Sequence, residues 1–173
     1  MTRHYSAALP IAYVVLRILI VLNWLVGAAI AVLLFVSPNE QWIMSAFDLT
    51  PSPDTSRLIW GLRAVAALGL VTIPLNHMIL KRMVAMIETV RTGDPFVAAN
   101  AYRLQAIAWI MAVLQVLSLV IAAIGKTVST PAHPVNLDAG FSVGGWLAVL
   151  FAFILARVFA EGTLMRADLD GTI

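Results

Sequence analysis

The sequence predicts an all-α integral membrane protein, a four-helix bundle that crosses the bilayer four times. Of its 173 residues, 61% are apolar and only 12% are charged, whereas a soluble domain of this size exposes far more charge. Four apolar runs are about as long as the ~20 residues that a helix needs to cross the hydrocarbon core. Because one such run cannot bury itself in a small soluble core, we expect a single membrane domain over residues 1–173.

The limits of the apolar runs set the expected membrane spans. They cover about residues 11–36, 57–80, 101–124 and 141–160. The first run is about twice as long as the apolar region of a signal peptide, which has roughly 7–15 residues. We therefore interpret it as an uncleaved first helix.

The connections between the spans carry most of the charge and indicate the orientation. We expect outer loops at about residues 37–56 and 125–140, and a central connection at about residues 81–100. Eight of the eleven Lys and Arg residues fall on the side of the termini and the central connection. Since positive charge is retained in the cytoplasm, we expect both termini and the connection to be cytoplasmic.

The residue types needed for most membrane chemistry are missing or scattered. The chain has no cysteine, which excludes disulfides, thiolate nucleophiles and cysteine-based metal sites. Its three histidines do not form the facing pairs that haem requires, and no Ser–His–Asp set or His-Glu-x-x-His motif is present. A weak outer metal site from His133 and Asp138 is the one alternative. We predict no catalytic, metal or cofactor site and no enzyme, and a net charge of +2 is too small to indicate nucleic-acid binding.

Four of the polar side chains inside the apolar spans are candidates for a specific role. These are Arg17, Asn23, Arg63 and Gln115. Arg63 is the most unusual, since an arginine about one third of the way into a span is costly. It either fixes helix packing by a buried hydrogen bond, with Gln115 and Ser118 at a similar depth, or contacts an anionic substrate in an outward-facing cavity.

The other two intramembrane polar residues have structural interpretations. Arg17 lies near the cytoplasmic end of its span, level with Glu161, so we expect a salt bridge between them. We expect Asn23 to form an interhelical hydrogen bond.

The fourth span carries small residues at every fourth position. The stripe includes Gly144, Ala148, Ala152 and Ala156. Such a stripe lets another helix approach closely. The approaching helix is either another span of the same chain or a second copy in a homo-oligomer.

The segment from Arg91 to Trp109 is the polar, turn-rich stretch between two apolar runs. Gly93 is a typical helix C-cap, and Asp94-Pro95 is typical of the cap and first position of a following helix. We expect Arg103 to pair with a carboxylate of the C-terminal tail, which offers Glu161, Asp168 and Asp170.

This segment and the tail resemble a family of bacterial membrane proteins, domain of unknown function 2975. The resemblance rests on Gly93-Asp-Pro-Phe96, Asn100 and Arg103-Leu104, and on Phe159-Ala-Glu-Gly162 with Asp170-Gly-Thr-Ile173. Gly171 stands where a leucine is usual. The resemblance implies four spans and a shared cytoplasmic motif of Gly93, Pro95, Phe96, Asn100, Arg103, Gly162, Asp170 and Thr172. Members are often encoded beside a small helix-turn-helix regulator, which implies a transcription regulator as partner.

Two functional hypotheses follow. The first is a non-enzymatic regulatory or sensory component of the bacterial cytoplasmic (inner) membrane. Its cytoplasmic face, the shared motif with Glu161, would dock a soluble partner. The alternative is a small-molecule- or peptide-binding protein, such as a transporter subunit or a toxin-immunity protein, that uses Arg63. An intramembrane enzyme is the least favoured, because the chain lacks a nucleophile–base pair.

Overall fold

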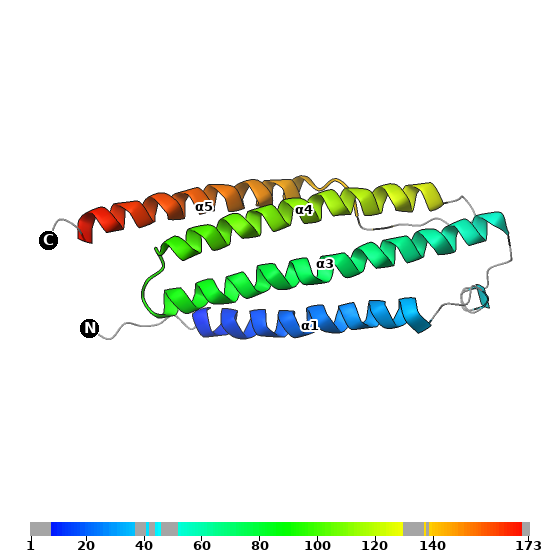
Figure 1. Cartoon of the computed structure of the whole chain (residues 1–173), viewed down its shortest axis with the longest axis horizontal. Coiled ribbons are helices and arrows are strands. Elements are labelled where there is room, and N and C mark those ends of the chain that lie inside the picture. Colours follow the sequence, from blue (N-terminus) through cyan, green and yellow to red (C-terminus); the bar gives the residue numbers. More distant parts are fainter. Residues whose placement is uncertain are drawn as a thin grey trace. The chain divides into compact units, whose positions relative to one another are not determined.

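The computed structural model describes residues 8–36, 41, 44–45, 52–129, 137 and 139–170. These residues form four long helices and contain no strand. The helices are α1 (Ala8–Val36), α3 (Pro53–Arg91), α4 (Ala98–Val128) and α5 (Val143–Asp170) (Figure 1). All four are long and apolar enough to cross a membrane. The predicted all-α, four-helix membrane fold class is therefore confirmed.

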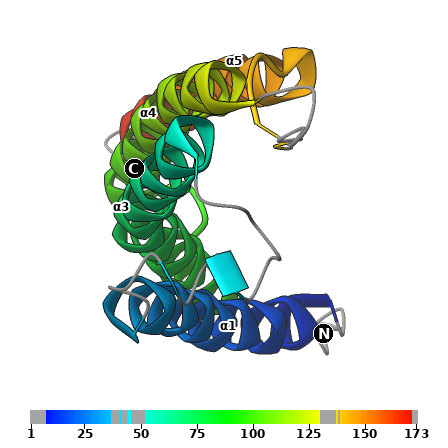
Figure 2. The ribbon, with the colours of Figure 1, turned by 90° about the vertical axis from the view of Figure 1, so that its right-hand side faces the viewer.

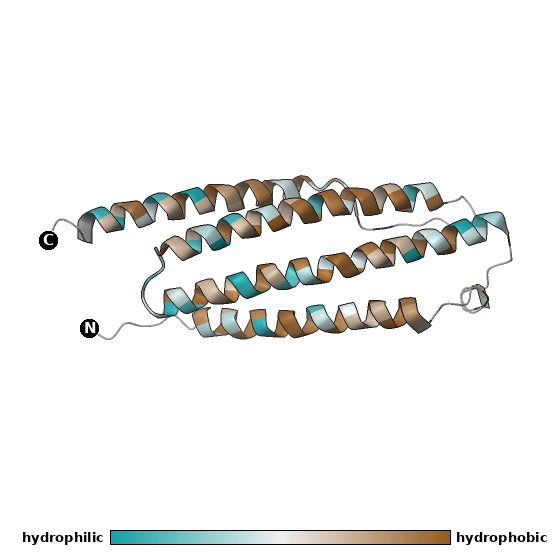
Figure 3. Cartoon of the chain, viewed as in Figure 1, coloured by the Kyte–Doolittle hydropathy of each residue, from teal (hydrophilic) through white to brown (hydrophobic). Residues whose placement is uncertain are grey.

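The apolar surface of the helices faces outward. Only 6–22% of the most apolar window of each helix is buried inside the chain. Large side chains such as Leu25, Val32 and Phe151 are about 60% exposed, and apolar residues follow one another along much of each helix (Figure 3). A surface of this kind is stable against lipid hydrocarbon and not against water, so the structure describes a multi-pass membrane protein.

The chain divides into two compact units. The connection unit contains Met1–Asn23, Leu75–Val113 and Val143–Ile173, and it holds the α3–α4 connection. The second unit contains Trp24–Pro74 and Leu114–Ser142. Helices α1, α3 and α4 each contribute residues to both units, whereas α5 belongs to the connection unit alone.

In the connection unit, α4 and α5 lie side by side (Figures 1 and 2). The rings of Trp109 and Phe153 meet edge to face with their centroids 5.2 Å apart, a geometry that aromatic pairs prefer. The buried apolar residues of this unit are Leu16, Val84, Ile107, Ala108, Ile110, Val149, Ala152 and Ala156. The buried core of the unit thus draws on all four helices.

The small-residue stripe of α5 divides between two environments. Ala152 and Ala156 are buried, so these two positions serve packing within the chain. Ala148 is exposed, and a Cβ added at Gly144 would meet nothing within 4 Å. Association of two copies through the stripe stays a prediction.

In the second unit, a side-chain cap starts α3 earlier than the apolar run indicates. The amide of Thr55 donates to the Ser52 hydroxyl at 3.1 Å, and Pro53 occupies the first helical position, where its missing N–H costs nothing. The helix then runs without a break through Pro74 to Arg91. Most of the expected outer loops, including His133 and Asp138, lies outside the described residues.

A glycine permits close packing of α3 and α4 in the second unit. A Cβ placed on Gly61 of α3 would lie 2.3 Å from the Cγ1 atom of Val128 of α4. Valine has a stiff side chain in a helix, so the contact has little room to adjust. The two helices can therefore approach this closely only with glycine at position 61.

We expect Gly61→Ala to lower the unfolding free energy by about 1–3 kcal/mol, the usual cost of overpacking. Gly144→Ala is the matched control, because the added methyl group meets open space. Unfolding of both variants in detergent micelles measures the difference. Equal stability of the two variants would show that α3 and α4 are not packed as described.

Candidate functional site

The connection between α3 and α4 begins with a helix cap. The amide of Gly93 donates to the carbonyl of Val90 at 3.1 Å, and the amide of Asp94 donates to the carbonyl of Thr89 at 3.0 Å. Gly93 has a φ of 88°, which glycine adopts at no steric cost. This pair of bonds is a Schellman motif, which satisfies carbonyls that a helix end leaves without partners. The prediction of a C-cap at Gly93 is confirmed.

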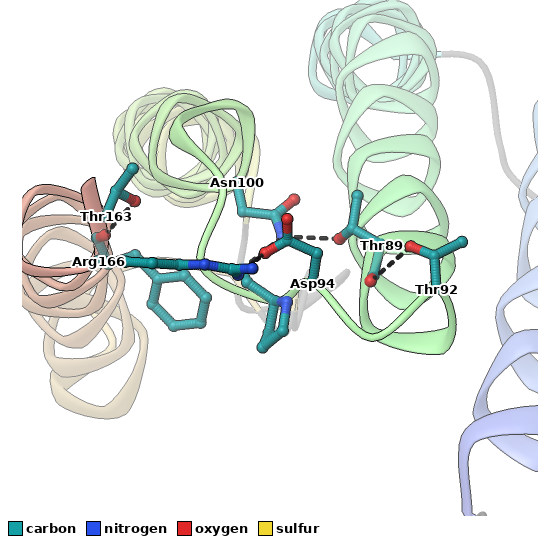
Figure 4. Close-up of polar contacts among 8 residues, drawn as sticks. Thr89, Thr92, Asp94, Asn100, Thr163 and Arg166 are labelled. Carbon is teal, nitrogen blue, oxygen red and sulfur yellow. Dashed lines mark hydrogen bonds and ion pairs between the residues drawn. The ribbon is translucent and has the colours of Figure 1, made fainter. Parts of the chain in front are cut away.

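The expected start of the next helix at Asp94-Pro95 is wrong. Residues 94–97 are not helical, and α4 begins at Ala98. The Asp94 carboxylate forms an ion pair with Arg166 of α5 (Figure 4). The Asp94 carboxylate, which was expected to cap the following helix, is therefore paired with a cation on α5 instead.

Asn100 is the centre of the hydrogen-bond network in this connection. Its side chain is fully buried. Its Nδ2 donates to the Thr89 hydroxyl at 2.7 Å and to the Pro95 carbonyl at 2.9 Å, and its Oδ1 accepts from Arg103 Nη1 at 2.7 Å. Both donors and one acceptor position of the amide are thus satisfied, as a buried amide requires.

The network extends from Asn100 into both helices. The Thr89 hydroxyl accepts from Asn100 because its own proton goes to the Met86 carbonyl at 2.7 Å. Arg103 also donates to the Ala85 carbonyl on α3, at 3.4 Å. Arg103 therefore ties α4 to α3. It forms no ion pair with Glu161, which pairs with Arg157, and the side chain of Asp170 lies outside the described residues.

The tail approaches the connection through an aromatic contact. The ring centroids of Phe96 and Phe159 are 5.3 Å apart. A Cβ on Gly162 would lie 2.8 Å from the Cδ1 atom of Phe96, so glycine at this position leaves space for the ring. The two segments that carry the family resemblance thus pack against each other. Thr172 and the side chain of Asp170 lie outside the described residues.

A groove of about 390 Å³ runs between α4 and α5 near the connection. It is lined by Ala98, Ala101, Tyr102, Gln105, Phe153, Ala156, Arg157, Ala160, Thr163 and Leu164. Tyr102 is 71% exposed at its rim. Arg157 forms an ion pair with Glu161 at 2.7 Å, and such an exposed pair contributes only about 0–1 kcal/mol. The groove therefore combines small apolar walls with polar groups that a ligand can reach.

The expected salt bridge between Arg17 and Glu161 is wrong. Glu161 pairs with Arg157, which is four residues away on the same helix. Arg17 instead donates to the Tyr13 hydroxyl, from Nη2 at 2.8 Å and from Nε at 3.2 Å. Each of these two side chains bonds to a residue one turn away on its own helix.

Arg63 belongs to the second unit. Its guanidinium stacks on the ring of Trp60, 5.2 Å from the centroid, and the Trp60 side chain is 62% exposed. Ser118, which was expected near Arg63, bonds to the backbone of Gly140. Gln115 of the second unit is half-buried, and so is Asn23 of the connection unit.

Sequence reasoning identified the residues of this site but not their contacts. It placed Gly93, Pro95, Phe96, Asn100, Arg103 and Gly162 in one motif, and the structure brings these six together. It missed Thr89, whose only signal was a hydroxyl one turn before the helix end. It also missed Arg166 as the partner of Asp94. In the described part of the chain, no three His, Asp or Glu residues are grouped so that they could hold a metal ion.

The chain matches a known protein family. A family model described as "Protein of unknown function (DUF2975)" matches residues 42–173, roughly three quarters of the chain. This range includes α3, α4, α5 and the whole connection, whereas α1 precedes it. No curated protein and no solved structure gives a significant match.

We expect Asn100→Ala to lower the unfolding free energy by about 2–4 kcal/mol, because it leaves Thr89, the Pro95 carbonyl and Arg103 without their partner. Hydrogen–deuterium exchange should show faster exchange of the amides between Thr89 and Arg103. Gln105→Ala is the control, since this exposed residue of α4 should change stability by less than about 0.5 kcal/mol. Unchanged exchange in Asn100→Ala would contradict the role of the network.

Proposed function

Because the chain belongs to the family described as protein of unknown function (DUF2975), we propose that it is a non-enzymatic regulatory or sensory membrane component. Its connection unit docks a soluble cytoplasmic protein, and the family resemblance implies a small helix-turn-helix regulator. The membrane is the bacterial cytoplasmic membrane. Eight of the eleven basic residues lie on the side of the termini and the connection, which supports a cytoplasmic position for this end.

The observation that carries the proposal is the C-terminal extension of α5. The helix continues to Asp170, about ten residues beyond the expected span, which corresponds to roughly 15 Å of helix. On this extension the side chains of Leu164 and Met165 are 61% and 63% exposed. Exposed apolar residues beyond the span expected from the sequence are typical of a surface that another protein covers.

The extension is held in place by the connection. Arg166 pairs with Asp94, and Phe96 packs against Phe159 and Gly162. These contacts fix the extension before a partner arrives, which reduces the entropy that binding must overcome. The motif residues thus build the docking surface, while Leu164, Met165 and the adjoining groove present it.

The groove favours one kind of contact from the partner. Its walls of small residues and Leu164 can accept the apolar side of an amphipathic helix. Arg157 and Tyr102 at the groove can receive an acidic side chain from the same helix. We therefore propose that the regulator inserts an amphipathic helix with an acidic residue next to its apolar face.

The alternative that relied on Arg63 has less support. The guanidinium stacks on an exposed tryptophan ring, and this arrangement is typical of an anchor at the membrane interface. We propose no second function on this residue.

The test uses the chain in nanodiscs and a purified helix-turn-helix regulator encoded beside its gene. We expect the double variant Leu164→Ser, Met165→Ser to weaken binding about tenfold, a typical loss when central apolar contacts are removed. Val90→Ser is the matched control, because Val90 is an exposed apolar residue near the same connection, on α3. Arg103→Ala is unsuitable, since it would also disturb the network around Asn100.

Two results would contradict the proposal. One is a regulator that does not bind the wild-type chain at any accessible concentration. The other is a regulator that binds the double variant as tightly as it binds Val90→Ser. The dissociation constants can be measured by fluorescence anisotropy, with size-exclusion profiles to confirm that each variant is folded.

A further inference from the structure

A tyrosine on α1 brings two arginines together in the connection unit. The Tyr13 hydroxyl accepts hydrogen bonds from Arg17, one turn further along α1. The Cζ atom of Arg17 lies 5.2 Å from the centroid of the Tyr13 ring, and the Cζ atom of Arg91 lies 5.7 Å from it. Arg91 is the last residue of α3. Two cations from two helices therefore share one aromatic ring.

Neither of these two guanidinium groups has a negative partner among the described residues. The acids near this end are occupied elsewhere: Asp94 pairs with Arg166, and Glu161 pairs with Arg157. Glu88 precedes Arg91 on α3 but forms no ion pair with it. The face of a tyrosine ring attracts each cation, but it does not neutralise their combined charge.

The pair lies toward the end of the connection unit at which α1 begins and α3 ends. Arg17 lies nine residues after Ala8, the first described residue of α1, which is roughly 13 Å along the helix. Its side chain reaches back toward the N-terminus to meet Tyr13, the direction in which helical side chains point and charged ends snorkel. The charge of Arg17 thus lies toward the end of α3, where Arg91 follows the apolar part of that helix.

We propose that Tyr13, Arg17 and Arg91 form a site for the phosphate group of an anionic phospholipid. Guanidinium groups bind phosphate through short, charge-assisted hydrogen bonds, and basic pockets between membrane helices bind anionic headgroups. The Tyr13 oxygen accepts from Arg17, so its own proton can be donated to a phosphate oxygen. A zwitterionic lipid is disfavoured, because the two guanidinium groups repel its ammonium group.

This site is separate from the proposed docking groove. The groove is lined by α4 and α5, whereas the site is formed by α1 and the end of α3. Loss of regulator binding would therefore leave the lipid proposal standing, and the reverse also holds.

The experiment compares lipid binding by native mass spectrometry of the purified chain, with phosphatidylglycerol against phosphatidylethanolamine. We expect the wild type to prefer phosphatidylglycerol, and Arg17→Gln and Arg91→Gln each to lower that preference about fivefold, the usual effect of one basic residue at an anionic surface. Arg82→Gln is the matched control, because Arg82 is on α3 and donates to its own helix at the Met78 carbonyl. It should keep the wild-type preference.

A further variant and a competitor make the outcome decisive. Tyr13→Phe keeps the ring and removes the hydroxyl, so we expect a smaller loss of preference than with either arginine variant. Equal losses of the phosphatidylglycerol preference in Arg17→Gln, Arg91→Gln and Arg82→Gln would overturn the proposal. The preference would then depend on the total basic charge and not on this site. Displacement of the lipid by millimolar inorganic phosphate would also overturn it, since the site would then bind a free anion. Retained lipid under these conditions supports a site for phospholipid.

Discussion

The buried side chain of Asn100 is the constraint on which the connection unit depends. An amide that is removed from water must find hydrogen-bond partners within the protein, or folding loses their free energy. Asn100 finds them in Thr89 on α3, in the Pro95 carbonyl of the connection and in Arg103 on α4. These three partners come from three successive segments, so satisfying one side chain fixes the path of the chain through the turn.

The fixed connection in turn determines where α5 lies. With residues 94–97 held outside either helix, Asp94 can meet Arg166 and the ring of Phe96 can occupy the space that Gly162 leaves. The extension of α5 is then anchored at two points. The family motif is accordingly a structural unit made from two distant segments, and the proposed docking groove adjoins it.

The sequence predicted the parts of the structure that depend on local chemistry. The four apolar runs indicated the helices, and Gly93 indicated the helix end, because length, hydropathy and a left-handed cap are properties of short segments. The Ser52-Pro53 cap of α3 has an equally local signal and could have been predicted. The contacts of Asn100 could not, because they depend on Thr89 lying across a turn whose geometry was not yet known.

The wrong predictions share one cause, which is competition among partners. Asp94 was expected to cap a helix, but Arg166 offers a full charge from 72 residues away. Arg17 and Glu161 were paired because they lie at a similar depth, yet each bonds to a residue four positions away on its own helix. Depth in a membrane restricts which residues can meet, and helical spacing then favours the nearest of them.

The packing of the connection against α5 is tested most directly by disulfide formation between cysteines placed at Phe96 and Gly162, in a chain that has no cysteine of its own. The structure predicts that Phe96→Cys, Gly162→Cys cross-links within one chain under mild oxidation and that Phe96→Cys, Gly144→Cys does not. Equal cross-linking of the two pairs, or none in the first, would contradict a connection that holds α5 in place.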